Sequence, residues 1–222
     1  NYNVVVGDEA GTAITNGDGN IVVGWSAGDA LTEGGVNTVV GHRALSTDTK
    51  GSKSVAIGPY ALYTQNFTTA TDTYNTAVGV DAGLSITSGV QNALTDADTN
   101  TVIGTYALTA DTKGSASVAI GHSTLGTQNF TTSTDSYNTA VGFYAGLAIT
   151  TGLWNTLIGG LAGDALTDAD FNVAVGKDAL GVDTLGSRSV AIGQGALQTQ
   201  NFTTATDGYN TAVGTLAGQA IT

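Results

Sequence analysis

The chain has 222 residues, a net charge of −12 and no cysteine. Its six Lys and Arg residues cannot form the basic patch that phosphate groups require, which excludes nucleic acid and argues against an anionic membrane surface as partner. No apolar run reaches the roughly 18 residues of a membrane span, and the absent cysteines exclude a disulfide frame and a thiolate metal site.

A nine-residue core recurs along the chain, at intervals of 17 to 25 residues. Position 1 is Asn or Ser, position 2 is Val, Ile or Thr, position 3 is Ala, Val or Leu, position 4 is Val or Ile, and position 5 is Gly. Position 8 is usually Ala, and position 9 is Gly or Leu. The cores begin at Asn3, Asn20, Asn37, Ser54, Asn75, Asn100, Ser117, Asn138, Asn155, Asn172, Ser189 and Asn210.

Each core predicts a short strand over positions 2 to 4, with both faces largely apolar. Side chains alternate across a strand, so positions 2 and 4 share one face and position 3 lies on the other. We expect one face to fill the coil interior and the other to meet a second chain, with position 4 building one continuous hydrophobic column. The position 4 residues are Val6, Val23, Val40, Ile57, Val78, Ile103, Ile120, Val141, Ile158, Val175, Ile192 and Val213.

The glycine at position 5 predicts a corner after every strand, and a second short strand is expected near positions 8 and 9. The leading Asn and Ser residues are expected to stack in a ladder. One coil cannot bury its apolar face alone, whereas stacked coils can. We therefore predict an all-β, parallel β-roll or β-solenoid of about twelve short coils over residues 1–222, taken from a longer protein because the chain lacks methionine. The coil expected to begin at Asn92 has lost nine residues relative to its equivalents, and a wide loop is expected near 88–99.

The motif Ser-Val-Ala-Ile-Gly at 54–58, 117–121 and 189–193 alternates with Asn-Thr-Ala-Val-Gly at 75–79, 138–142 and 210–214. These residues resemble the head repeats of trimeric autotransporter adhesins of the YadA type, which also occur in phage tail fibres. The resemblance implies a left-handed parallel β-roll and a homotrimer, with Val55 and Ile57 inside the roll and Ala56 facing the neighbouring chain. The coils here are longer than the usual ones of that family.

Three loops, at 64–72, 127–135 and 199–207, repeat Gln-Asn-Phe-Thr-Thr. They are candidate contact loops for a host-surface glycan or protein, with an Asn-Phe pair at the tip of each. The alternative is that each Phe caps its own roll or packs between chains. The same loops hold the Asn-x-Thr sequons of the chain, which are candidate glycan acceptors. The pairs are Asn66 and Phe67, Asn129 and Phe130, and Asn201 and Phe202.

No residue pattern indicates catalysis or a cofactor, so we expect a protein that is not an enzyme. Acidic clusters at 16–20, 96–98 and 168–170 are candidate Ca²⁺ ligands, although turn residues explain them more simply. The two histidines, His42 and His122, are isolated, and Trp25 and Trp154 suit either a sugar or a subunit interface.

The expected function is an extracellular rod on a cell or virion surface that attaches through its repeated outer loops. The rod is expected to be a homo-oligomer, with a trimer favoured and an end-to-end filament as the other arrangement. A purely structural filament or tail-fibre subunit without receptor binding is the first alternative. An ice-binding solenoid is the second, and it would need a flat and regular Thr array.

Overall fold

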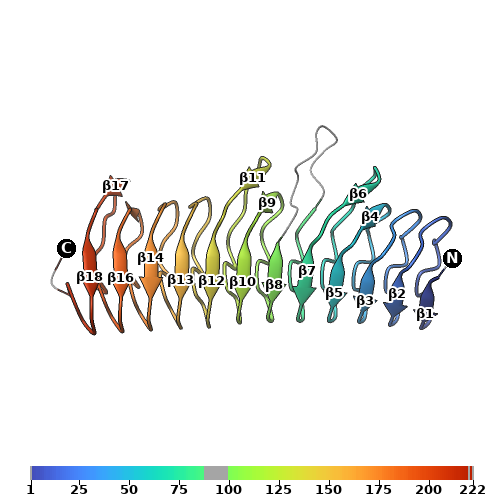
Figure 1. Ribbon diagram of the computed structural model, residues 1–222, viewed down its shortest axis with the longest axis horizontal. Coiled ribbons are helices and arrows are strands. Elements are labelled where there is room, and N and C mark those ends of the chain that lie inside the picture. The colour runs from blue at the N-terminus through green and yellow to red at the C-terminus, as the bar shows by residue number, and fades with distance from the viewer. Residues whose placement is uncertain (1, 88–99, 220, 222) are drawn as a thin grey trace.

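The structure is a computed structural model that describes residues 2–87, 100–219 and 221. The described chain forms a parallel β-solenoid of twelve coils, one for each core in the sequence (Figure 1). The all-β solenoid prediction is therefore confirmed, whereas its left-handedness stays a prediction. The wide loop expected near 88–99 lies outside the described residues.

Each coil contributes one three-residue strand to a single sheet, and each strand pairs in parallel with the next coil's strand. The register aligns equal repeat positions, as in Val141↔Ile158 and Ile158↔Val175. The strands are β1 (Val4–Val6), β2 (Ile21–Val23), β3 (Thr38–Val40), β5 (Val55–Ile57), β7 (Thr76–Val78), β8 (Thr101–Ile103), β10 (Val118–Ile120), β12 (Thr139–Val141), β13 (Thr156–Ile158), β14 (Val173–Val175), β16 (Val190–Ile192) and β18 (Thr211–Val213).

Three coils carry an additional arm, defined here as the residues between the conserved Gln and the next core's first strand. Each arm pairs with the preceding coil through two-residue strands and stands out along one edge of the rod (Figure 1). The arm pairs are β4 (Gly51–Ser52) with β6 (Thr71–Asp72), β9 (Gly114–Ser115) with β11 (Thr134–Asp135), and β15 (Gly186–Ser187) with β17 (Thr206–Asp207).

The glycine at position 5 is needed for two reasons. Gly142 has φ +140°, a conformation that L side chains rarely adopt. A Cβ on Gly142 would also lie 2.5 Å from the carbonyl oxygen of Gly159, the equivalent residue in the next coil. The predicted corner is therefore confirmed. The second strand expected near positions 8 and 9 is wrong, because turns occupy those positions in the described coils.

The face that points into the coil is the opposite of the predicted one. Position 3 is fully buried in coil after coil, as Ala56, Ala119 and Ala174 show. Position 4 lies on the outer side, where Ile57 is 36% exposed and Ile158 is 40% exposed. The position 4 residues do form one column in register, but that column lies outside the core in the single chain. The expectation that Ala56 faces a neighbouring chain is wrong.

Small residues occupy position 3 because the coil interior is already filled from the other side. Position 8 contributes a buried Ala in most coils, and the remaining space takes one large residue from position 9 or position 12. Where position 9 is Gly, position 12 is apolar, as in Gly163 with Leu166. Where position 9 is Leu, position 12 is polar, as in Leu108 with Asp111. A Cβ on Gly163 would lie 2.8 Å from the Leu166 side chain, which explains the exchange.

The leading asparagines form the predicted ladder. The Asn20 side-chain oxygen accepts the backbone N–H of Asn37 at 2.9 Å, and its amide nitrogen donates to the Gly34 carbonyl at 2.9 Å. Asn138 and Asn155 repeat the contact at 2.9 Å. These side chains are buried, so the ladder satisfies polar groups that would otherwise destabilise the stack.

Candidate functional site

The largest candidate site is the outer face of the twelve-stranded sheet, defined as positions 2 and 4 of every coil. Val, Ile and Thr side chains occupy all of it, and parallel pairing places them in two straight columns. Over the roughly 4.8 Å spacing of strands, twelve coils give a face about 53 Å long. An apolar face of this length on a single chain is typical of an interaction surface.

Two rims flank the outer face. The leading rim is position 0, the residue before position 1, and the trailing rim is position 6, the residue after the corner glycine. On the leading rim Tyr137, Trp154 and Phe171 lie one coil apart and stay 44%, 48% and 44% exposed. On the trailing rim Phe143 is 54% exposed. The rims therefore widen the apolar face with large side chains.

Negative charge is nearly absent from this surface. The chain has 18 Asp and Glu residues, yet position 0, position 2, position 4 and position 6 of the twelve cores together hold only Asp8. Other carboxylates lie at the edge of the leading rim, where Asp72 pairs with Lys53 at 2.5 Å and Asp207 with Arg188 at 3.1 Å. Positions 2 and 4 themselves carry no charged residue in any coil, and an exposed apolar surface without charge is typical of the central part of a protein–protein interface.

The leading rim adopts a backbone conformation that its residues disfavour. Trp154 has φ 60° and Phe171 has φ 59°, and Gly19 occupies the equivalent place with φ +70°. A non-glycine residue in this left-handed region costs about 1–2 kcal/mol. Glycine would fit at lower cost, so the contacts of the aromatic side chains at these positions must offset that backbone cost.

The exposed aromatic rings stack on one another along the rod. Trp154 stacks on Tyr137 at 4.1 Å between ring centroids and on Phe171 at 6.2 Å. The predicted isolation of the histidines is also modified, because His42 stacks on Trp25 at 4.8 Å and His122 on Phe143 at 5.5 Å. Since the stacked rings cover each other's faces, their edges rather than their faces meet solvent. A sugar ring needs an open aromatic face, so this arrangement does not favour a sugar platform.

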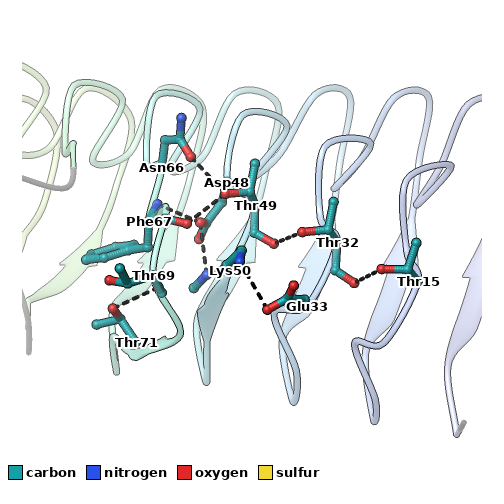
Figure 2. A network of polar contacts seen from close by, with 11 residues as sticks. Thr15, Thr32, Glu33, Asp48, Thr49, Lys50, Asn66, Phe67, Thr69 and Thr71 are labelled. Atoms are coloured by element: carbon teal, nitrogen blue, oxygen red, sulfur yellow. Dashed lines mark hydrogen bonds and ion pairs between the residues drawn. The ribbon is translucent and has the colours of Figure 1, made fainter. Parts of the chain in front are cut away.

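The candidate anchors of the three loops are buried. Phe67 and Phe130 are each 5% exposed, and Phe202 is half-buried. They pack beneath the arms, which confirms the alternative that each Phe caps its own roll and is not a contact anchor. In Figure 2 the Phe67 backbone N–H points at Asp48, whose Oδ1 accepts it at 2.9 Å.

Each arm is held by a buried polar relay of Asp, Gln and Asn. Asp48 Oδ1 also accepts the Gly51 N–H at 3.0 Å, and Gln65 Nε2 donates to Asp48 Oδ2 at 2.7 Å. Gln65 Oε1 in turn accepts Asn75 Nδ2 at 2.9 Å. The second relay, Asp111–Gln128–Asn138, and the third, Asp183–Gln200–Asn210, repeat these contacts. Because all partners are supplied from the chain, the relay is a structural device.

Burial raises the pKa of Asp48 and of Asp111 above its usual value, and hydrogen bonds from Gln65 and Gln128 oppose that rise. Each carboxylate accepts hydrogen bonds but has no cation as partner among its contacts. The relay therefore holds the arm at some electrostatic cost.

The exposed part of each loop begins at the asparagine beside the buried Phe. Asn129 and Asn201 are exposed and Asn66 is half-exposed. Asn66 lies at the end of a row in which Thr15 donates to the Thr32 carbonyl at 3.1 Å and Thr32 to the Thr49 carbonyl at 2.9 Å (Figure 2). Thr49 Oγ lies 3.3 Å from Asn66 Oδ1.

The acidic clusters are used as turn residues where the structure describes them. Asp168 Oδ1 accepts the hydroxyl of Thr150 at 2.7 Å, and the Thr151 hydroxyl lowers the pKa of that carboxyl. Asp18 Oδ1 accepts the backbone N–H of Tyr2 and of Gly19. Asp96 and Asp98 lie outside the described residues. Within 2–87, 100–219 and 221, no three His, Asp or Glu side chains come together as metal ligands would.

Neither the rims nor the relay were predicted, although the sequence contains a signal for each. An aromatic residue precedes the leading Asn in six cores, and Asp or Gln stands at position 12 of every core that has Leu at position 9. Comparison of the chain with family models, curated proteins and solved structures gave no match. In the part of the chain that the structure describes, no helix has the length and apolar character to cross a membrane.

Proposed function

We propose that this chain is a structural rod of an extracellular filament or fibre that assembles side by side with copies of itself through the outer face. The observation that carries the proposal is the apolar face of twelve strands, which is continuous along the rod and holds almost no carboxylate. The chain has a net charge of −12, yet positions 2 and 4 carry no charged residue in any of the twelve coils, so the face itself adds no repulsion between copies.

The size of the face supports a stable assembly. A face about 53 Å long that is about 20 Å wide with its rims covers roughly 1,000 Å² per copy, using the rise and spacing of strands. Standard protein–protein interfaces bury about 800 Å² per partner, so the face of one copy is about the size of one such interface, and in a trimer it would be shared between two neighbours.

A parallel homotrimer is the assembly that we propose, as the resemblance to YadA-type head repeats implies. Three flat faces of equal chemistry can surround one axis, with each copy's coils level with those of its neighbours. The parallel register within each chain keeps equal residues at equal heights, so identical coils would meet at every level.

A second candidate function is attachment of the rod to a glycan or protein through the arms. The arms stand out at the fourth, seventh and eleventh coils, so three and four strand spacings separate them, or about 14 and 19 Å. A row of this kind suits several weak contacts at once. Because Phe67 and Phe130 are buried, their side chains are not available as apolar anchors for a receptor. The geometry therefore favours the structural role of the rod over attachment.

Analytical ultracentrifugation of the purified chain tests the proposal, with Ile158→Glu as the disrupting variant and Ala70→Glu as the matched control. Ile158 lies on the outer face, and Ala70 lies on an exposed arm. We expect a trimer for the native chain and for the control, and a monomer with unchanged circular dichroism for Ile158→Glu. A native chain that sediments as a monomer at all concentrations would refute self-assembly.

A further inference from the structure

The asparagines of the three arms share a feature that the ladder asparagines lack. In the described part of the chain the Nδ2 atoms of Asn66, Asn129 and Asn201 have no hydrogen-bond partner, whereas the Oδ1 atoms lie 3.3, 3.0 and 3.3 Å from a threonine hydroxyl. Figure 2 shows the amide nitrogen of Asn66 directed away from Asp48 and Thr49. The nucleophilic side of each amide therefore faces solvent.

The residues that follow each asparagine complete an acceptor motif. Thr68, Thr131 and Thr203 stand two residues after the asparagine, and all three are exposed. The Phe between them points inward and is fixed beneath the arm, so the Asn and the Thr are presented on the same outer turn. Asn-x-Thr on an exposed turn is the substrate pattern of N-glycosylation.

The fold also separates these asparagines from those that it must keep unmodified. The ladder asparagines are buried except Asn3 and Asn210 in the two end coils, and the residue two places after each is the apolar residue of position 3, which is buried in every coil but the first. A Thr or Ser cannot stand there without loss of core packing, so no ladder asparagine has a sequon. Every Asn-x-Thr of the chain lies on an arm.

We propose that Asn66, Asn129 and Asn201 are N-glycan acceptor sites and that the rod displays its glycans in one row. The donor is an activated sugar whose anomeric carbon bears a phosphate leaving group. The amide nitrogen forms a bond to the anomeric carbon, the bond from that carbon to the phosphate oxygen breaks, and the phosphate leaves with the electron pair while the amide loses one proton. The glycans would extend from the arms and leave the outer face uncovered. This inference rests on the extracellular part of the proposed function.

The test is secretion of the full chain, behind a cleavable signal peptide, from a eukaryotic cell line that glycosylates asparagine. Intact mass is measured before and after treatment with peptide N-glycosidase. We expect three glycans on the native chain. Thr68→Ala should remove the glycan at Asn66 alone, whereas Thr69→Ala, the same change one residue later and outside the sequon, should leave all three.

An unshifted mass of the secreted native chain would overturn the proposal. The variant Asp18→Thr, which places an Asn-x-Thr on exposed Asn16, then shows whether the host accepts other turns of this rod. Sedimentation of the same material separates this inference from self-assembly. A glycosylated monomer would contradict assembly and keep the acceptor sites, and an unmodified trimer would do the reverse.

Discussion

Gln128 donates a hydrogen bond of 2.6 Å to Asp111 Oδ2, and both side chains are fully buried between adjacent coils. The pair joins the interior of one coil to the interior of the next. In these two coils position 12 is polar, and Leu108 and Leu125 at position 9 supply the large apolar side chain instead. The arm with its buried Phe130 is fixed to the rod at this same level.

Removal of the donor leaves a buried carboxylate oxygen without its partner. We expect Gln128→Ala to lower the free energy of unfolding by about 1.5–3 kcal/mol, the range for a hydrogen bond to a charged group. Thr69→Ala, at an exposed position of an arm, is the control and should change it by less than about 0.5 kcal/mol. Urea denaturation followed by circular dichroism measures both, and equal midpoints for the two variants would contradict the structural role of the relay.

The buried aspartates make stability depend on pH. Burial raises the pKa of Asp48 and Asp111 in the folded chain above 3.8, the ordinary pKa of an aspartate side chain. The fold therefore favours the protonated carboxyl, so the stabilising contribution is complete below pH 3.8 and is lost as pH rises through the folded pKa. We expect the melting temperature to rise as pH falls across this window.

Acidification also relieves the repulsion of a chain with net charge −12, so a control must separate the two effects. The double variant Asp48→Asn and Asp111→Asn removes the buried groups and keeps nearly all of the surface charge. Its melting temperature should rise less on acidification than that of the native chain. An identical pH profile would show that the buried carboxyls do not contribute.

Two phenylalanines of opposite exposure separate packing from assembly. Phe130 is 5% exposed beneath an arm, and Phe143 is 54% exposed on the trailing rim. We expect Phe130→Ala to destabilise the chain by about 3–4 kcal/mol and Phe143→Ala to change monomer stability little while it weakens the trimer. Denaturation and sedimentation of both variants check this, and a reversal of the two effects would contradict the placement of the rims.

The exchange between position 9 and position 12 predicts energetic coupling. Gly28→Leu alone should destabilise the chain, because a Cβ at Gly28 would lie 2.9 Å from the Leu31 side chain, although leucine adopts the same left-handed backbone at Leu45 with φ 48°. Leu31→Ala alone leaves a cavity. In the double variant the new leucine fills that cavity, so we expect a favourable coupling of about 1–3 kcal/mol in a double-mutant cycle. Additive effects would argue against a shared volume.

The leading rim offers a change that favours the monomer and opposes assembly. Trp154→Gly removes a side chain from a left-handed position, where glycine costs less by about 1–2 kcal/mol. The lost stacking on Tyr137 and Phe171 offsets part of that gain, so we expect unfolding of the monomer to change by less than about 1 kcal/mol. The trimer should dissociate at a higher protein concentration. A strongly destabilised monomer would show that the ring serves the chain's own fold.

Coil number, strand positions, corner glycines and the asparagine ladder could all be predicted from the sequence. These features follow from residues such as Gly142 and Asn20 whose backbone or hydrogen-bond requirements admit few alternatives. The inward face could not be predicted by the same route, because positions 2, 3 and 4 are all apolar and alternation alone does not say which face is inside. The resemblance to YadA-type head repeats placed positions 2 and 4 in the interior, whereas the volume there is filled from position 9 or position 12.

Leu157 shows how closely the interior volume is matched. It is the one leucine at position 3, and a Cβ on Gly146 or on Gly163 would lie 2.7 or 2.8 Å from it. Glycines in its own coil and in the preceding coil thus make room for a larger residue.

The loop residues could be located from the sequence, but the inward turn of Phe67 depends on Asp48 in the preceding coil, which lies 19 residues away.

The chain has no cysteine, so a single introduced thiol reports on the central claim that the outer face meets the same face of another copy. Ile158→Cys should form disulfide-linked dimers under mild oxidation, because equal coils lie level around the axis. Leu157→Cys, one residue away and buried within the coil, should stay unlinked. Linkage of the Leu157 variant in place of the Ile158 variant, or of neither in a chain that sediments as a monomer, would contradict the account.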